Sequence, residues 1–250
     1  MKKILLFVFL FFSFFSCEKY SIDNHFKVIA HGGYWELVDG ADNSIMGLVE
    51  AVRLGVDGVE LDICKTKDDS LVVIHGLYHG DYYIPETDYK DLKKIILSNG
   101  EEISTFREYM KEAVKYDILY FVELKTKGEE SDVLQILNQY NLQYKIRFSS
   151  FSSEICETLL KKDANLNVAY INGDKSPREL KDKGYSGMNY EISVWKKHSD
   201  WIDEAKSLGL ELSAWVVKTE SDIIWCSTHG INYLITDSPL EAIHFRSNYE

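Results

Sequence analysis

Short apolar runs alternate with longer amphipathic segments from residue 27 to about residue 240. The short runs are apolar almost throughout, which is typical of strands buried on both faces of a parallel sheet. The longer segments carry apolar residues at helical spacing. No linker rich in Pro, Gly or Ser interrupts the alternation, so the pattern predicts a single α/β domain.

Nine segments are expected to be strands and six to be helices. The expected strands are residues 27–31, 58–63, 71–75, 118–125, 145–150, 167–171, 187–192, 210–217 and 231–237. The expected helices are residues 44–55, 104–116, 152–162, 177–183, 199–208 and 220–228. Nine strands in one domain fit a closed (β/α)8 TIM barrel with one spare strand better than an open sheet. Which strand is spare stays open, but the step from residue 63 to 71 is too short for a usual parallel crossover.

The first sixteen residues have the pattern of an export signal. Lys2 and Lys3 precede an apolar run that is too short to span a bilayer comfortably and that ends at Cys17. The sequence FFSC around Cys17 resembles a bacterial lipoprotein processing site, so Cys17 is the expected lipidation site and the protein an expected exported, membrane-anchored lipoprotein. An uncleaved anchor or an ordinary signal peptide is the alternative. The expected organisation is a signal peptide (1–16), a tether (17–26) and the barrel (27–250), with a small excursion at about 76–100.

Charge and cysteine content narrow the class of protein. The chain carries 28 Lys and Arg against 40 Asp and Glu, a net charge of −12. This balance argues against a broad nucleic-acid surface, which needs a basic stripe. Cys64, Cys156 and Cys226 permit at most one disulfide bond and are expected to be packing residues.

Polar side chains gather where the expected strands end. Active sites of TIM barrels are built at the carboxyl ends of the strands. Four strands in succession end in such residues: His31, then Glu60 with Asp62, then His75, then Glu123 with Lys125.

The spacing of these carboxylates predicts a cation site. Glu60 and Asp62 are two residues apart and therefore share one face of a strand, and Glu123 and Lys125 repeat this spacing on another. Three carboxylates from two strands suit one hard divalent cation, Ca²⁺ or Mg²⁺, rather than Zn²⁺. The alternative is a structural ion pair between Lys125 and Glu60 or Asp62 in the barrel mouth.

These residues also carry a family resemblance. The segments HGG, NS and GVDGVELDICKTKDDSLVVIH, followed by FVELK, resemble the motifs of the glycerophosphodiester phosphodiesterase family. The segment FSSFSSE and the tail LSAWVVKTESDIIWCSTHGINYLITDSP also resemble that family, so the likeness spans about residues 27–240.

The resemblance implies a role for eight residues. It implies Glu60, Asp62 and Glu123 as metal ligands and His31 and His75 as an acid–base pair. It implies that the substrate is bound by Lys125, Trp215 and Asn43.

Four positions depart from the family pattern. Gly32 stands where the family has a phosphate-binding arginine, and Gly76 stands where it has an aspartate. Lys218 replaces an asparagine, and residues 42–44 read Asp-Asn-Ser rather than Glu-Asn-Thr. The chain is therefore similar to a variant branch of the family with the same core chemistry.

The expected function is metal-dependent hydrolysis of small-molecule glycerophosphodiesters to glycerol phosphate and an alcohol. One alternative is a phospholipase C or D type enzyme, or a glycan phosphodiesterase, of the same superfamily. The other is a catalytically inactive binding lipoprotein, because the arginine and the aspartate are missing.

Overall fold

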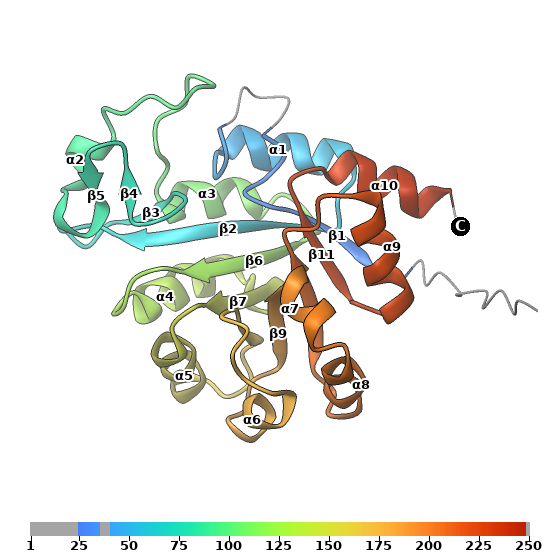
Figure 1. The fold of residues 1–250 in the computed structure, drawn as a ribbon. Helices are drawn as coiled ribbons and strands as arrows, with labels where there is room; N and C mark the ends of the chain where they lie inside the picture. The colour runs from blue at the N-terminus through green and yellow to red at the C-terminus, as the bar shows by residue number, and fades with distance from the viewer. Residues whose placement is uncertain (1–24, 36–40, 249–250) are drawn as a thin grey trace, which may run out of the picture.

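Eight parallel strands close into a barrel in the computed structural model, which describes residues 25–35 and 41–248. The strand order is β1-β11-β10-β9-β8-β7-β6-β2, and pairing of Ile29 and Ala30 with Gly58 and Val59 closes the ring (Figure 1). The barrel strands are β1 (Lys27–Ala30), β2 (Gly58–Lys65), β6 (Leu119–Leu124), β7 (Ile146–Ser150), β8 (Val168–Tyr170), β9 (Gly187–Glu191), β10 (Glu211–Trp215) and β11 (Tyr233–Thr236). The prediction of a (β/α)8 TIM barrel is confirmed. The expected signal peptide, Cys17 and most of the expected tether lie outside the described residues.

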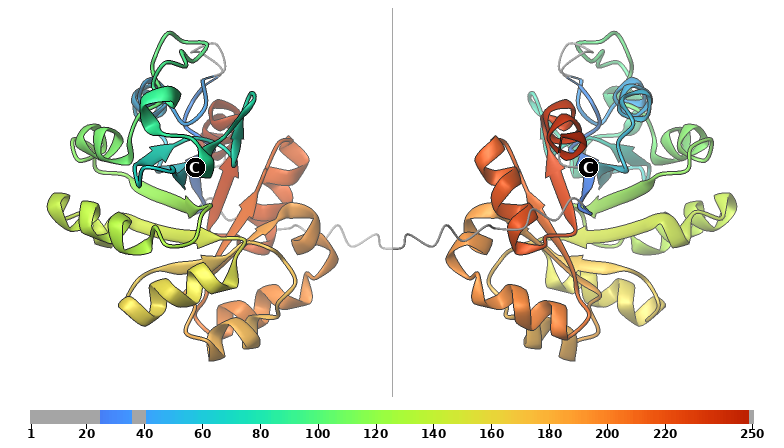
Figure 2. Two further views of the ribbon diagram at one scale, coloured as in Figure 1. Left: turned by 90° about the vertical axis from the view of Figure 1, so that its left-hand side faces the viewer. Right: turned by 90° about the vertical axis from the view of Figure 1, so that its right-hand side faces the viewer.

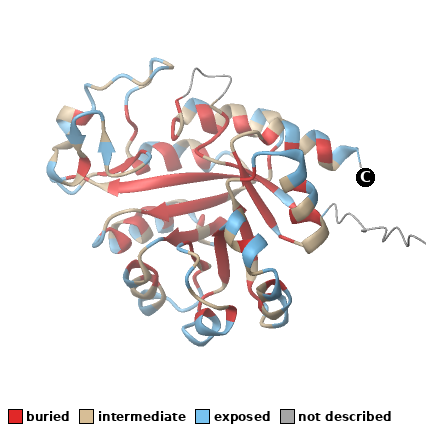
Figure 3. Cartoon of the chain, viewed as in Figure 1, coloured by how far each residue is buried: buried red, intermediate tan, exposed pale blue. Residues whose placement is uncertain are grey.

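Helices surround the strands on the outside (Figure 2). They are α1 (Ile45–Leu54), α3 (Phe106–Ala113), α4 (Glu130–Tyr140), α5 (Ser153–Lys162), α6 (Pro177–Asp182), α7 (Ile192–Lys197), α8 (Asp200–Ser207), α9 (Glu220–His229) and α10 (Pro239–Ser247), with a 3-10 turn η3 (Gln143–Lys145) before β7. All six expected helices are present, although the one expected at 104–116 is shorter, while α4, α7 and α10 were not predicted. Each helix buries one face against the strands and exposes the other (Figure 3). No helix in the described part of the chain is long and apolar enough to cross a membrane.

The spare strand is β3 (Leu71–Val73). It pairs antiparallel with β2, with Ile63 opposite Val73 and Lys65 opposite Leu71, and it is not one of the eight barrel strands. His75 therefore does not follow a barrel strand, and the doubtful step between residues 63 and 71 is where the spare strand lies. Because β3 runs antiparallel to β2, the chain after β3 comes back beside Asp62. Ile74 N donates a hydrogen bond to the Asp62 carbonyl at 3.1 Å.

The excursion after β3 has its own small core. It contains a hairpin of β4 (Tyr78–His79) and β5 (Tyr82–Tyr83), the 3-10 turn η2 (Ile84–Glu86) and α2 (Tyr89–Leu92), a short helix that was not predicted. Ile84, Leu92 and Ile103 pack there against Val72 and Ile74. The excursion lies beside the carboxyl ends of the strands (Figure 1).

The cysteines of the described residues are packing residues, as predicted. Cys64, Cys156 and Cys226 are buried and free.

Candidate active site

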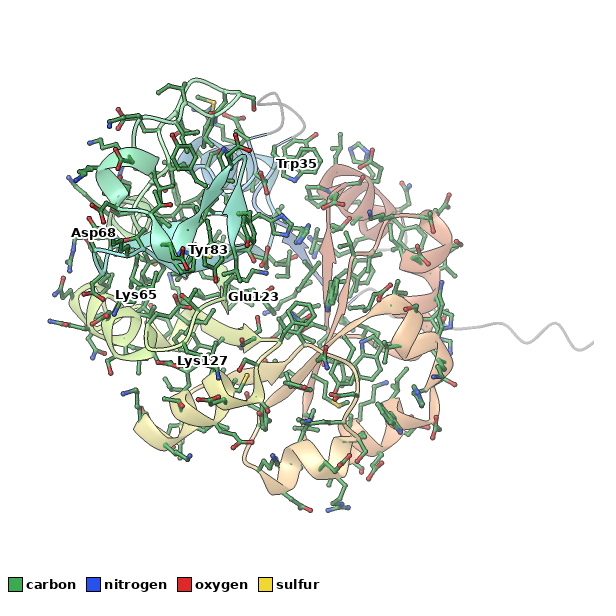
Figure 4. All side chains as sticks on the ribbon, turned by 60° about the vertical axis from the view of Figure 1, so that its left-hand side comes forward. Trp35, Lys65, Asp68, Tyr83, Glu123 and Lys127 are labelled. Atoms are coloured by element: carbon green, nitrogen blue, oxygen red, sulfur yellow. The ribbon has the colours of Figure 1, made fainter. Side chains whose placement is uncertain are left out.

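A cavity of about 280 Å³ opens at the carboxyl ends of the barrel strands. It is lined by His31, Glu60, Asp62, His75, Glu123, Lys125, Phe151, Ile171, Asn189, Trp215, Val216 and Ile235. Figure 4 is turned so that this end of the barrel comes forward; Glu123 lies within the mouth, whereas Asp68 lies on the outer surface. Seven of the eight residues singled out in the sequence thus line one cavity, and only Asn43 does not.

Three carboxylates converge in this cavity. Parallel pairing of β2 with β6 places Asp62 opposite Glu123, and Glu60 lies two residues before Asp62 on the same face. One oxygen from each of the three lies within 4.8 Å of the other two. All three are buried, with exposed fractions of 4% for Glu60, 2% for Asp62 and 8% for Glu123. Within the described residues, no other group of His, Cys, Asp and Glu is arranged to hold a metal ion.

The loop after β1 holds two of these carboxylates in place. The Asn43 side chain forms two hydrogen bonds with Asp62: its Nδ2 donates to Asp62 Oδ2 at 3.0 Å, and its Oδ1 accepts from Asp62 N at 2.8 Å. Gly32 N donates to Glu60 Oε2 at 3.1 Å. Asn43 therefore lies behind the carboxylates, where it fixes the orientation of Asp62.

Lys125 is the cation nearest to this group. Its Nζ lies 2.8 Å from Asp62 Oδ1 and also forms an ion pair with Glu123. The predicted alternative of a structural ion pair thus has a counterpart in the structure. One lysine leaves three buried carboxylates undercompensated, however: burial, followed by the charge of Asp62, raises the pKa of Glu60 and of Glu123. This donor set fits a divalent cation, because Lys125 and the partly exposed His31 do not balance three buried carboxylates.

His31 is oriented by an aspartate from the last strand of the barrel. Its Nδ1 lies 2.7 Å from Asp237 Oδ1, and its Nε2 lies 3.9 Å from Glu60 Oε2. The hydrogen bond from His31 lowers the pKa of Asp237, so the carboxylate is ionised and Nδ1 must donate. Burial lowers the pKa of His31, but the bond to Asp237 and the charge of Glu60 outweigh it and raise the pKa to about 9.

His75 lines the same cavity as His31. Its ring is exposed and lies edge to face with that of His31, with 6.3 Å between the centroids. The two imidazoles therefore share one cavity above the carboxylates.

The far wall of the cavity is apolar. Trp215 and Phe151 pack edge to face with centroids 5.7 Å apart, and Ile171 lies in the same lining. The indole is fixed because Trp215 Nε1 donates to the Asn189 carbonyl at 2.9 Å. The expected position of Trp215, at the substrate cavity, agrees with this geometry.

The departures from the family pattern fall around the site. Gly32, at the position of the missing arginine, adopts φ +64°. Among the described residues, Lys125 is the one Lys or Arg that lines the cavity. Lys218 is exposed and its Nζ lies 3.7 Å from Asp237 Oδ2, on the side of Asp237 away from His31. The missing arginine therefore has no direct replacement in this lining.

Three site residues were missed in the sequence: Asp237, Phe151 and Asn189. Asp237 had a usable signal, because it ends an expected strand (231–237) as His31 ends another (27–31). Asn189 lies inside the strand segment GMNYEI as an isolated polar residue, which is also a signal. Phe151 follows β7 and carries no signal that separates it from a packing residue.

Comparison with known proteins agrees with this geometry. The sequence model of the "Glycerophosphoryl diester phosphodiesterase family" matches residues 30–241. A crystal structure of a glycerophosphodiester phosphodiesterase from Parabacteroides distasonis is 32% identical, with a TM-score of 0.86 over 91% of this chain and 99% of that one. A glycerophosphodiester phosphodiesterase from Caldanaerobacter subterraneus is 27% identical over 238 residues, which are 87% of this chain and 96% of that protein.

A more distant structure was solved with a bound product. It is a phosphodiesterase from Oleispira antarctica in complex with sn-glycerol-3-phosphate, 22% identical, with a TM-score of 0.78 over 88% of this chain and 96% of that one. At this identity the likeness shows the fold. The family match over most of the chain and the closely superimposable Parabacteroides structure go further: the chain belongs to the glycerophosphoryl diester phosphodiesterase family and is an enzyme of that class.

Proposed function

We propose that the enzyme hydrolyses glycerophosphodiesters to glycerol phosphate and an alcohol, with one divalent cation, Ca²⁺ or Mg²⁺, held by Glu60, Asp62 and Glu123. The convergence of three buried carboxylates and two histidines on one cavity carries this proposal. A bound cation supplies the positive charge that polarises the phosphoryl oxygen. Every ligand offered is a carboxylate oxygen, which suits a hard cation.

Lys125 is proposed to stabilise the negative charge that develops on the phosphate. Its ammonium group lies among the carboxylates and faces the cavity. Burial lowers the pKa of Lys125, but the charges of Asp62 and Glu123 raise it above its usual range, so the side chain stays charged at neutral pH. A charged donor fixed in place before the reaction costs no reorganisation when the charge develops.

His31 and His75 are proposed to transfer the protons. Asp237 fixes the His31 ring through Nδ1, which leaves Nε2 on the side of Glu60 and the cavity. His75 lines the same cavity, with its ring edge to face with that of His31. One imidazole would accept the proton of the glycerol hydroxyl group next to the phosphodiester bond, which attacks phosphorus, and the other would protonate the leaving alkoxide. Water would then open the resulting cyclic phosphate to glycerol phosphate.

We further propose that the protein is an exported lipoprotein anchored through Cys17. Cys17 and the signal peptide lie outside the described residues, so this proposal rests on the sequence. The described chain enters β1 at its amino end, whereas the cavity lies at the carboxyl ends of all eight parallel strands. An anchor attached through the tether would thus join the barrel at the end opposite the cavity. This arrangement favours soluble glycerophosphodiesters over phospholipids in the anchoring membrane.

The test is product analysis by phosphorus NMR with the purified protein and Ca²⁺, Mg²⁺ or Mn²⁺. Glycerophosphocholine, glycerophosphoethanolamine, phosphatidylcholine and an inositol and a glycan phosphodiester would serve as substrates. We expect glycerol phosphate from the first two, and loss of turnover with a chelator. Preferential cleavage of the intact lipid or the glycan would support the phospholipase-like or glycan alternative. Absence of turnover with every substrate and cation would support the inactive binding protein.

The anchor has a separate test. Cys17→Ser is expected to move the protein from the membrane fraction to the soluble fraction without loss of activity. An unchanged membrane fraction would contradict lipidation at Cys17.

A further inference from the structure

The cavity has two unlike halves. The charged half consists of His31, Glu60, Asp62, His75, Glu123 and Lys125. The other half is formed by Phe151, Ile171, Trp215, Val216 and Ile235, with a single polar side chain, that of Asn189. If the phosphate is bound at the charged half, one of its two alcohol substituents must lie along the apolar half.

Asn189 has an unused acceptor there. The residue is 4% exposed, and its Oδ1 is buried without a hydrogen-bond partner among the described residues. Buried amide oxygens in native proteins almost always have a hydrogen-bond partner, because it costs free energy to move such an oxygen out of water without replacing its hydrogen bonds. The backbone carbonyl of Asn189 is already used by the Trp215 indole, so the backbone is held in place, while rotation of the amide group about χ2 would turn Oδ1 toward the cavity that the residue lines.

Among the other buried side-chain oxygens that lack a hydrogen-bond partner in the described residues, Ser149 offers a comparison. Ser149 Oγ is also buried without a partner, but Ser149 lines a separate space of about 10 Å³, together with Ala169, Gly187 and Ser213. That space approaches the size of one water molecule. Asn189 instead lines the cavity of about 280 Å³, where a ligand can supply the missing donor once the amide group has turned.

We propose that Asn189 is a specificity-determining residue whose Oδ1 accepts a hydrogen bond from a hydroxyl group of the glycerol moiety, while Trp215 and Phe151 pack against its carbon atoms. This inference rests on the proposed function. An acceptor oxygen selects for a donor: a polyol offers hydroxyl groups, whereas a choline headgroup offers none. The glycerol half therefore lies inside the cavity and the other alcohol points to the mouth, where many headgroups can be accommodated.

The terminal hydroxyl group is the one assigned to Asn189. The hydroxyl group next to the phosphodiester bond stays near the cation and the histidines as the proposed nucleophile. The terminal hydroxyl group is one carbon farther from the phosphate, toward the apolar wall. A substrate that lacks only this group keeps the reacting atoms and loses the proposed contact.

The experiment compares glycerophosphocholine with the choline phosphodiester of propane-1,2-diol, which lacks the terminal hydroxyl group. For the unmodified enzyme, we expect kcat/KM to be about tenfold or more lower with the deoxy substrate, because a buried acceptor is then left unpaired. In Asn189→Leu, which keeps the size of the side chain and removes the acceptor, this ratio should fall to about one. Ser149→Ala, which removes an unpartnered oxygen outside the cavity, should leave the ratio unchanged.

Binding provides a readout independent of turnover. Calorimetry should give tighter binding of glycerol 3-phosphate than of propane-1,2-diol 1-phosphate to the unmodified enzyme, and equal binding to Asn189→Leu. If Asn189→Leu lowers kcat/KM for both diesters by the same factor, or if the unmodified enzyme does not distinguish them, the role assigned to Asn189 is wrong. If the unmodified enzyme cleaves neither diester, the proposed function itself fails.

Discussion

The two ends of the barrel interior differ in how their charges are balanced. At the amino end, Arg147 donates to Glu211 through Nε at 3.0 Å and Nη2 at 3.1 Å, and Tyr233 Oη donates to Glu211 Oε1 at 3.1 Å. One positive charge meets one negative charge, and Phe121 packs on Tyr233 beside them. At the carboxyl end, Lys125 faces three carboxylates, and burial raises the pKa of two of them.

This difference separates a structural pair from a binding site. The pair at the amino end is satisfied by the protein itself and needs nothing further. At the carboxyl end, the burial of three carboxylates lowers the stability of the fold, and a bound cation would remove this penalty. A buried charge cluster by itself therefore indicates little, whereas an imbalance of charge beside a cavity indicates a ligand.

Glu60→Gln is expected to have the largest effect on activity. It removes one of the three proposed cation ligands while keeping the shape of the side chain, so kcat/KM should fall by about 10⁴-fold. The fold should remain, because the change also relieves repulsion with Asp62. Turnover of glycerophosphocholine and thermal melting measure the two effects.

The matched control for Glu60→Gln lies at the other end of the barrel. Glu211→Gln weakens the contact with Arg147 and should lower stability by about 1–2 kcal/mol, with kcat/KM within about twofold of the unmodified enzyme. Equal loss of activity in both variants would contradict the conclusion that the carboxyl end is the active site and the amino end a structural ion pair.

His75→Ala should have the next largest effect. Loss of a general acid or base lowers the rate by about 10²- to 10⁴-fold. The lower part of this range is expected here, because the exposed ring position allows water to replace the imidazole in part. His79→Ala is the control, since His79 lies in the same excursion but does not line the cavity. A His75→Ala enzyme with unchanged kcat/KM would rule out proton transfer by this residue.

The barrel and most of its site were predictable from local patterns. Buried parallel strands are apolar along their whole length, and the rule that functional groups follow the carboxyl ends of strands located Glu60, Asp62, Glu123 and His31. His75 reaches the same mouth by another route, because β3 is antiparallel to β2.

What could not be predicted depends on contacts distant in the sequence or on weak local signals. His31 and Asp237 are 206 residues apart, and closure of the barrel brings them together. The six residues of α7 are too few to show a helical period, whereas α10 begins with Pro239, a helix-start signal that was overlooked. The eleven residues of α4 do carry buried Val133, Ile136 and Leu137 at helical spacing, so that helix was predictable and was overlooked.

Asn43→Gly should have a smaller effect, which sharpens the comparison within the carboxyl end. Glycine tolerates the φ of +58° at this position, so the change removes the two side-chain hydrogen bonds to Asp62 without adding backbone strain. Groups that orient a metal ligand contribute about 10- to 100-fold to metal affinity or activity. Calorimetric titration with Ca²⁺ or Mg²⁺ should show this loss of affinity, and added cation should restore part of the activity. An unchanged cation affinity would mean that Asp62 is oriented without Asn43.

The smallest expected effect is on stability, and its sign follows from the pKa values. His31 has a pKa of about 9 in the folded protein against 6.5 for the free side chain, so its contribution is full below pH 6.5 and is lost as pH rises through about 9. The raised pKa of Glu60 acts in the same direction, because folding becomes less favourable once the unfolded chain has released that proton. The cation-free protein should therefore lose about 1–3 kcal/mol between pH 6.5 and 9, and Ca²⁺ or Mg²⁺ should raise Tm more at pH 8.5 than at pH 5.5. In Glu60→Gln this pH-dependent gain should shrink, whereas in Glu211→Gln it should persist, since the balanced pair at the amino end binds no cation. A gain in Tm that is independent of pH would mean that the cation acts away from the carboxylates of the mouth.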